Sequence, residues 1–487
     1  MADQAGKADK ADKADKADKT DKADKADKTN KEDKTNKEIE KGVSLDGLKH
    51  QLEGFSDKVA KTLKAPAGDC ELLYVRSLCD SVIISRDVVV PFYEVKDLSE
   101  YQDYIASFPG SSQPKSNQEA LSGLMDGYVF LNIQGESYLF EAYKAQNSSV
   151  KETLTESVVQ GPSDALTENL QVNLNLVRRR YPTPRLKIEM VTIGKTSKTK
   201  SAIIYDEERV NPDILDELKK KVDKIEADMM QSMGQLEKEV SDERYRIFPK
   251  TVVTERPDRV VYNLARGKVA VLMDTTGFAL LLPTVFTDFF AAMDDRYQLP
   301  LVGRFLKLMR YLGLVMTLLI PAMYVAFTSY NPEILRIQIA LLVAGSRATV
   351  PYPSFVEVLL MLLMMEFLTE ASLRLPKAIG PTATTVGGLI LGQAATEAGL
   401  VGNIMIILVS AVAISNFLIP LNMMSFAVRV VKYVFIFLAA LFGLFGVAIG
   451  VVGLIMYLCN LRSFGQPYMK VFPLDQLGPA KRGGGNG

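Results

Sequence analysis

A few carboxylate and amide side chains interrupt the apolar blocks in the last third of the sequence, and such groups can bind cations or form hydrogen bonds. Glu366 and Glu370 lie in one block, Gln393 and Glu397 in the next, and Asn416 in a third. Lipid tolerates such groups only at a cost, so the helices that carry them must face protein or water. We therefore expect these residues to mark a pore or a polar site within a membrane domain.

The block around Glu366 predicts one helix with a polar face. Glu366, Glu370 and Arg374 follow one another at intervals of four residues, which favours an ion pair between Glu370 and Arg374 near the membrane edge. Glu366 has no partner nearby in the sequence. It either leans toward a water-filled cavity, where a ring of subunits would place several carboxylates around a cation path, or is a protonated or hydrogen-bonded packing residue. Leu362 and Met365 of the same helix could close a dewetted gate in that path.

The start of this helix has a capping signal. Ser354 follows Pro353 and precedes Glu357 by three residues, the spacing of a capping box. Glu357 is therefore expected to cap the helix rather than to bind an ion.

The next polar segment, 379–399, predicts a broken or re-entrant element. Gly and Pro interrupt it, and such backbone is tolerated at membrane depth only where it is buried in protein or lines water. Gly388 with Gly392, and Gly446 with Gly450, also form small-xxx-small pairs that let helices approach one another. Close packing is the expected role of these glycines.

Hydrophobic helices must position all of these side chains. Two blocks, 306–327 and 431–459, each exceed the ~20 apolar residues that cross a ~30 Å hydrocarbon core, and each is expected to span it in one pass. The polar side chains lie in three further blocks: 355–373, 386–400 and 404–428. Together the blocks predict a polytopic α-helical transmembrane domain.

Flanking charges predict its orientation. Basic residues near Arg304, after Arg374 and beyond Lys470 place both termini in the cytoplasm by the positive-inside rule. Four crossings plus the re-entrant segment satisfy that rule. Arg429 and Lys432 fit it poorly, so five crossings remain open.

Shifts in composition divide the chain into five parts. The N-terminal Ala-Asp-Lys repeat has almost no side chain able to build a core and is expected to be disordered. Strand and helix patterns alternate in the two regions that follow, which predicts an α/β fold in two cytoplasmic subdomains. The predicted parts are a low-complexity tail at 1–42, a first α/β subdomain at 43–150, a second at 151–303 that includes a helical linker and an interfacial helix, the transmembrane domain at 304–462, and a cytoplasmic C-terminal tail at 463–487.

Local motifs predict several elements of the soluble regions. Residues 70–78 and 81–90 are strand-rich, and hairpins are expected at 128–143 and 268–282. A short helix should begin at Pro257 and end before Gly267, where its start and stop signals lie.

Two further motifs bear on function. Phe286, Phe289, Phe290 and Met293 share one helix face, which suits either the headgroup boundary of a membrane or a protein core. Gly194-Lys195-Thr196 resembles the end of a phosphate-binding loop, but Glu189 occupies the position of the required first glycine and the turn joins two expected strands. We reject that motif because a phosphate loop must open a helix.

Composition excludes several classes of function. The net charge of the chain is zero, whereas a nucleic-acid-binding protein is usually basic. The chain has three cysteines at irregular spacing and one histidine, His50, too few for a disulfide framework, a four-ligand zinc site or a histidine triad. We expect neither an enzyme nor a metal or cofactor site.

The chain resembles the A subunits of the GerA-type spore germinant receptors. The resemblance covers roughly 157–469 and rests on several blocks in the right order rather than on any single one. The blocks are Val159-Gln-Gly-Pro162, Asn173-Leu-Asn-Leu-Val-Arg-Arg-Arg180, Phe248-Pro249, Thr254-Glu-Arg-Pro-Asp258, Gly267-Lys-Val-Ala-Val-Leu272, Arg374-Leu-Pro376, Gly387-Gly388, Gly392-Gln-Ala-Ala395 and Ser463-Phe-Gly-Gln-Pro-Tyr468.

The resemblance implies a multi-pass subunit of the spore inner membrane that oligomerises into the cation-conducting part of a nutrient receptor. It also implies two partners, a transporter-like B subunit and a C-subunit lipoprotein. Two other functions remain open: a secondary transporter, although no internal repeat of the usual kind is found, and a non-conducting scaffold that relays a signal.

Overall fold

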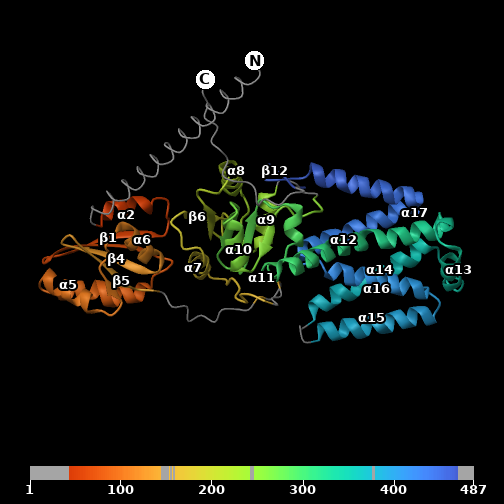
Figure 1. Cartoon of the computed structure of the whole chain (residues 1–487), viewed down its shortest axis with the longest axis horizontal. Coiled ribbons are helices and arrows are strands. Elements are labelled where there is room, and N and C mark those ends of the chain that lie inside the picture. The colour runs from red at the N-terminus through yellow and green to blue at the C-terminus, as the bar shows by residue number, and fades with distance from the viewer. Residues whose placement is uncertain are drawn as a thin grey trace, which may run out of the picture. The chain divides into compact units, whose positions relative to one another are not determined.

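The structure is a computed structural model that describes residues 43–143, 153, 156, 160–241, 246–375 and 379–469 (Figure 1). The N-terminal repeat, and the C-terminal residues beyond 469, lie outside the described residues. The chain divides into two compact units: one runs to Ser149 and includes Leu174–Glu189, and the other contains Val150–Asn173 and everything from Met190 onward.

The first unit is built on a five-stranded sheet in the order β1-β2-β4-β5-β3. The predicted hairpin at 128–143 is confirmed, because β4 and β5 pair antiparallel and Gln134 and Gly135 take the positive φ values that a tight hairpin turn requires. The strands are β1 (Lys58–Ala65), β2 (Gly68–Val75), β3 (Ser111–Ser112), β4 (Tyr128–Ile133) and β5 (Glu136–Glu141), and the helices are α2 (Leu45–Gln51), α3 (Ser81–Ile83), η1 (Ile84–Val89), α4 (Val90–Glu94), α5 (Leu98–Ser107) and α6 (Asn117–Met125).

The strand expected at 81–90 is wrong, because this segment is helical. The Asp80 side chain accepts a hydrogen bond from the Val82 N–H and caps the start of α3. Ile84, Val88 and Phe92 are buried at intervals of four residues, which is the period of a helix face. The sequence of this segment therefore predicts its apolar character, but the four-residue spacing of its buried side chains indicates a helix rather than a strand.

Two of the three cysteines lie in this unit and are buried. Burial raises the pKa of the Cys70 thiol to about 12, with the Glu71 carboxylate adding to the shift, and burial likewise raises the pKa of Cys79 to about 12. Cys459, at the end of the last helix, is exposed. We therefore expect an alkylating reagent at pH 8 to modify Cys459 about a thousandfold faster than the other two, because the thiolate is the nucleophile.

Peptide mass spectrometry of folded protein quenched at successive times measures these rates, and a urea-unfolded sample is the control in which all three thiols should react alike. Modification of Cys70 or Cys79 at a rate close to that of Cys459 in the folded protein would contradict the expectation.

A second five-stranded sheet has the order β6-β7-β9-β10-β8. The predicted hairpin at 268–282 is confirmed by the antiparallel register of β9 and β10, and α10 begins at Pro257 as its start signal predicts. The strands are β6 (Leu186–Ile193), β7 (Thr199–Asp206), β8 (Val252–Thr254), β9 (Val269–Met273) and β10 (Ala279–Leu282), and the helices are α7 (Leu170–Arg180), α8 (Pro212–Asp223), α9 (Met233–Val240), α10 (Pro257–Leu264) and α11 (Asp294–Tyr297).

The phenylalanine-rich segment after β10 lies in the protein core. It forms a 3-10 helix, η2 (Phe286–Phe290), in which Phe289 and Phe290 are fully buried. The Phe290 ring stacks on Tyr311 with centroids 5.0 Å apart. Of the two expected roles, the structure therefore selects the core and excludes the headgroup boundary.

The C-terminal part of the chain is a bundle of helices. Among the described residues, α12 and α17 are long and apolar enough to cross a membrane, by length and composition alone. The bundle helices are α12 (Pro300–Ser329), α13 (Ile337–Ser346), α14 (Ser354–Arg374), α15 (Gly380–Glu397), α16 (Asn403–Phe417) and α17 (Asn422–Asn460), with the 3-10 turn η3 (Pro332–Ile334) before α13.

Helix α17 is a hairpin of two helical arms rather than one straight helix. Gly443 has φ 57° and ψ −137°, which breaks the helix at this point. A Cβ on Gly446 would overlap the Leu438 carbonyl oxygen, and one on Gly450 would touch the side chains of Phe435 and Leu438, so the arms run antiparallel and close together (Figure 1). The single span expected at 431–459 is therefore wrong, although the close packing expected of Gly446 and Gly450 is confirmed.

The break in the backbone expected within 379–399 is wrong, because α15 is continuous over its described length. Pro381 lies in the first turn, where its missing N–H breaks no helical hydrogen bond. A Cβ on Gly387 would lie 2.9 Å from the Leu368 side chain of α14. The glycines thus serve packing rather than a break in the backbone.

The helical segments run back and forth between two ends of the bundle, which we call the sheet end and the distal end. The sheet end is where α12 begins and α17 ends. There, Gly313 of α12 packs against the Ser415 carbonyl of α16, and Gly380 of α15 packs against the Ser372 carbonyl of α14. At the distal end, Tyr330 donates a hydrogen bond to the Ala440 carbonyl at 2.5 Å. The described chain thus passes along the bundle six times, through α12, α14, α15, α16 and the two arms of α17, where the sequence predicts four or five passages.

Candidate functional site in the helical bundle

A buried carboxylate organises the distal end. Glu357 is fully buried, and its carboxylate accepts hydrogen bonds from the Gly402 N–H (2.8 Å), Arg347 Nε (3.1 Å) and the Tyr324 hydroxyl (3.4 Å). These donors come from the start of α16, from the loop before α14 and from α12. One side chain of α14 therefore joins three other parts of the chain.

The capping box expected at this helix start is wrong. The helix begins at Ser354, with Pro353 rather than Ser354 as its N-cap, and no side chain caps it. Ser354 Oγ lies 2.5 Å from Ser329 Oγ, a contact between α14 and α12. Tertiary partners hold both Ser354 and Glu357, so neither is available for the local motif.

A second polar cluster lies nearer the sheet end, between α14 and the first arm of α17. Glu366 accepts hydrogen bonds from Arg429 Nε (2.7 Å) and Arg429 Nη2, and from Lys432 Nζ (2.8 Å). The Lys432 side chain is only 5% exposed, and the Arg429 guanidinium lies 5.4 Å from the centre of the Phe426 ring. The structure therefore pairs Glu366, whose side chain is 20% exposed, with two cations from another helix.

This cluster has a surplus of positive charge. One carboxylate faces two cations, so Glu366 is occupied as an acceptor and is not free to bind a permeating cation. Sequence reasoning missed the pairing because Arg429 and Lys432 are more than sixty residues away. The sequence does hold one signal for this pairing. Arg429 and Lys432 lie where a four-crossing topology under the positive-inside rule does not expect basic residues.

The other predicted residues of α14 divide between packing and surface. Leu362 is 2% exposed and packs inside the bundle, and Met365 is half-buried. Arg374 Nη2 donates to Glu370 Oε1 at 2.8 Å, so the predicted ion pair is confirmed, and it is exposed. Asn416 Oδ1 accepts from the Ser425 hydroxyl at 3.2 Å, which joins α16 to α17.

Helix α15 presents a mixed face outward, on which Val386, Leu389 and Ile390 are exposed beside polar side chains. Thr382, Gln393 and Glu397 are exposed, and at 100° per residue they lie within about 60° of one another around the helix. Gly392 and Ala395 lie on the other side and are buried. A helix at the edge of an apolar bundle thus keeps its polar residues on the side that faces away from its own protein.

The last residues described are part of the second sheet's core, where the sequence predicts a free tail from residue 463. β11 (Arg462–Ser463) and β12 (Gln466–Pro467) form a tight hairpin that buries Phe464 among the side chains of that core. The Ser463 hydroxyl donates to the Lys250 carbonyl at 2.7 Å, and the Tyr468 hydroxyl donates to the Pro249 carbonyl at 2.8 Å. The hairpin thereby attaches the final helix to the sheet.

The start of α12 is attached to the same region. Arg310 Nη2 donates to Asp295 Oδ1 at 2.8 Å, and Arg310 Nη1 donates to the Phe290 carbonyl at 3.1 Å. Both pairs are largely buried. The first and last segments of the bundle are therefore held to one sheet by buried contacts.

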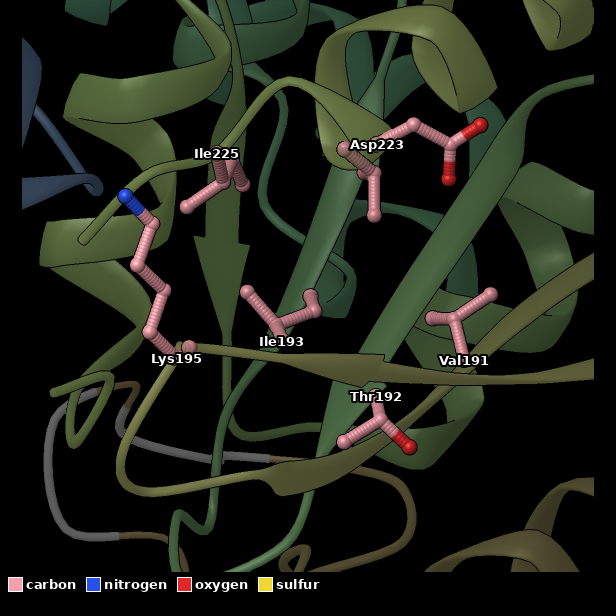
Figure 2. A pocket seen from close by; sticks show the side chains of 8 residues that line it. Val191, Thr192, Ile193, Lys195, Asp223 and Ile225 are labelled. Atoms are coloured by element: carbon pink, nitrogen blue, oxygen red, sulfur yellow. The ribbon is translucent and has the colours of Figure 1, made fainter. Parts of the chain in front are cut away.

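A surface hollow of about 360 Å³ lies at the turn between β6 and β7. Figure 2 shows Lys195 on one side of it and Asp223 on the other. The N–H groups of Lys195, Thr196 and Ser197 donate to the carbonyls of Ala227 and Asp228 and so cannot hold an anion. This is consistent with rejecting a phosphate-binding loop here. Across the described residues, no group of three or more His, Cys, Asp or Glu side chains could hold a metal ion.

Comparison with known proteins shows the family. The model of the Bacillus/Clostridium GerA spore germination protein matches residues 46–478. The chain belongs to the GerA family. The resemblance to the A subunits of GerA-type germinant receptors is thus confirmed.

Relatives of this GerA-family chain match it over most of their length. Spore germination protein GerLA of Bacillus cereus is 36% identical over 86% of this chain and 90% of its own. The uncharacterized membrane protein YfkQ of Bacillus subtilis (strain 168) is 32% identical over 90% of this chain and 86% of its own. The crystal structure of the N-terminal domain of the A subunit of the Bacillus megaterium spore germinant receptor GerK3 aligns with 50% of this chain and 98% of that one, at 24% identity and a TM-score of 0.38.

Proposed function

We propose that this GerA-family protein is the membrane subunit of a nutrient-responsive spore germinant receptor, and that a ring of identical copies forms a ligand-gated channel for monovalent cations. Membership of the GerA spore germination family supports the proposed role in germination. The observation that carries the channel is the exposure of Gln393 and Glu397 on the outward side of α15, because a ring would turn these polar side chains toward a shared path.

Several features support six membrane crossings. At 1.5 Å per residue the segments measure roughly 22 to 45 Å. The longer ones would cross a ~30 Å hydrocarbon core by extending beyond it or tilting, and the shortest, α16, would cross where the bilayer is locally thinner. Basic side chains gather toward the sheet end, including Arg429 and Lys432, which fitted four crossings poorly. With six crossings these residues lie on the same side as the sheet, and the positive-inside rule makes that side cytoplasmic. The membrane would be the spore inner membrane, as the family resemblance implies.

The conducting path lies along α15 rather than α14. Leu362 is packed inside its own bundle and Glu366 is paired, whereas Gln393 and Glu397 are exposed on the outward face. Polar residues facing lipid are costly, and a ring of copies removes that cost by surrounding water with them. The path would therefore carry a ring of Glu397 carboxylates near its distal mouth, which attracts cations.

The partners proposed for this subunit are the transporter-like B subunit, as the site of nutrient binding, and the C-subunit lipoprotein. Both come from the family resemblance. Two other functions compete with the channel: a secondary transporter and a non-conducting scaffold. They differ in what the purified oligomer does in a membrane.

Planar-bilayer recording of the purified oligomer tests the channel. We expect ohmic cation current, and we expect Glu397→Gln to lower the conductance by about tenfold at low salt because the attracting carboxylates are lost. The loss should shrink at high salt, where charges are screened. Glu370→Gln, which removes an exposed carboxylate of α14, is the matched control and should leave conductance unchanged.

Other outcomes separate the competing functions. Saturable, stoichiometric flux would indicate a transporter, and silence from an intact assembly would indicate a scaffold. Equal conductance in Glu397→Gln and Glu370→Gln would remove α15 from the path.

A further inference from the structure

Helix α13 at the distal end is apolar around most of its circumference, and Gln338 and Ser346 are the polar side chains among its ten residues. Between Arg336 and Arg347 the described chain carries no charged side chain. Ile337 is 77% exposed and Leu341 is 68% exposed, and Ile339 lies on the opposite side of the helix from Ile337 and is also exposed. None of its residues is buried.

This pattern differs from that of a helix that docks on a partner protein. A docking helix has one apolar face for the partner and one polar face for water. A partner that covered Ile337 would leave Ile339 in water, because the two side chains point about 160° apart. A helix with exposed apolar side chains on opposite sides needs an apolar surrounding on both of those sides, and acyl chains provide one.

The length and attachment of α13 fix how it can lie in lipid. Ten residues measure about 15 Å, which is half of a hydrocarbon core, so α13 cannot cross a bilayer. Its C-terminal end is held at the distal end of the bundle, because Arg347 bonds to the buried Glu357. Arg336 at the other end is exposed and long enough to reach headgroup phosphates.

We propose that α13 lies submerged in the distal leaflet of the membrane, with acyl chains against the apolar side chains on its opposite sides and Arg336 among the phosphates. The inference rests on the proposed membrane insertion of the bundle. It assigns a lipid-binding element outside the six crossings and places it directly beside the Glu357 contacts that join α12, α14 and α16. Lipid packing in that leaflet would then act on the bundle through the bond between Arg347 and Glu357.

Depth-dependent fluorescence quenching of the full-length protein tests the proposal. In a Cys459→Ser background, Ile337→Cys and Ile339→Cys are each labelled with NBD and reconstituted into phosphatidylethanolamine and phosphatidylglycerol vesicles. Doxyl-labelled lipids quench from the acyl region, and iodide quenches from water. We expect both positions to be quenched by doxyl lipid, with iodide quenching about fivefold weaker than at Glu333→Cys in the exposed turn before α13.

Val452→Cys, exposed in the second arm of α17, separates this proposal from the proposed membrane insertion. If doxyl lipid quenches a label there but iodide alone quenches both α13 labels, α13 lies in water and the inference is wrong while the bundle still spans. If one α13 label is shielded from both quenchers, a second protein chain covers that side, which also overturns the inference. If the Val452 label escapes lipid quenching, both proposals fail.

Discussion

Replacing Glu366 by glutamine is expected to lower the free energy of unfolding by about 3 to 5 kcal/mol. The neutral amide keeps the shape of the side chain but leaves Arg429 and Lys432 largely buried without a counter-charge. Equilibrium unfolding in detergent micelles measures the change. Glu370→Gln on the same helix is the matched control, since it breaks an exposed ion pair and should cost about 1 kcal/mol or less.

A double variant sharpens this test. In Glu366→Gln, the added change Lys432→Met removes one of the stranded cations and should recover part of the lost stability, because the two sites are coupled. A loss no larger than that of the Glu370→Gln control would show that the cluster is solvated. Because Arg429 and Lys432 hold the Glu366 carboxylate, we expect Glu366→Gln to affect stability more than cation preference.

Substitution of Gly443 by alanine is expected to destabilise the bundle by about 1 to 3 kcal/mol from backbone strain alone, because φ 57° with ψ −137° is a conformation that only glycine adopts readily. A Cβ there would also lie 2.9 Å from the Tyr330 side chain, so the true loss should exceed this range. Thermal unfolding of the purified protein measures the difference.

Gly453→Ala in the second arm is the matched control. Nothing lies within 4 Å of a Cβ at that position, and alanine favours a helix by up to about 1 kcal/mol over glycine. If Gly443→Ala and Gly453→Ala behave alike, then Gly443 is not a tight turn and the two arms form one straight helix.

The sequence predicts those parts of the fold whose signals are local. The β4–β5 and β9–β10 hairpins and the start of α10 follow from turn residues and proline position, and the structure contains all three. The turn at Gly443 was missed because apolar side chains on both sides read as one span. A glycine within an apolar run is usually a packing residue, and its backbone angles cannot be read from composition.

The candidate site depends on contacts between distant segments, and these leave little trace in one sequence. The Glu370–Arg374 pair was predicted because both residues lie on one helix turn. The partners of Glu357 and Glu366 lie outside their own helix, so local rules predict a cap for Glu357 and leave Glu366 open between a cavity and a packing role. The sequence predicts that α15 carries polar residues, but not that these residues face outward. Their direction depends on which side of α15 packs against α14.

The hairpin that carries Phe464 constrains the order in which the protein can be made. The second sheet is translated before the bundle, yet its core contains a side chain that follows the last helix. A ribosome adds about 5 to 20 residues per second, so the sheet must wait on the order of ten seconds, with an opening in its core, while the helices between are synthesised. Completion of this core is therefore a late event in biogenesis, and in the proposed membrane topology it can occur only after the final helix has emerged on the same side as the sheet.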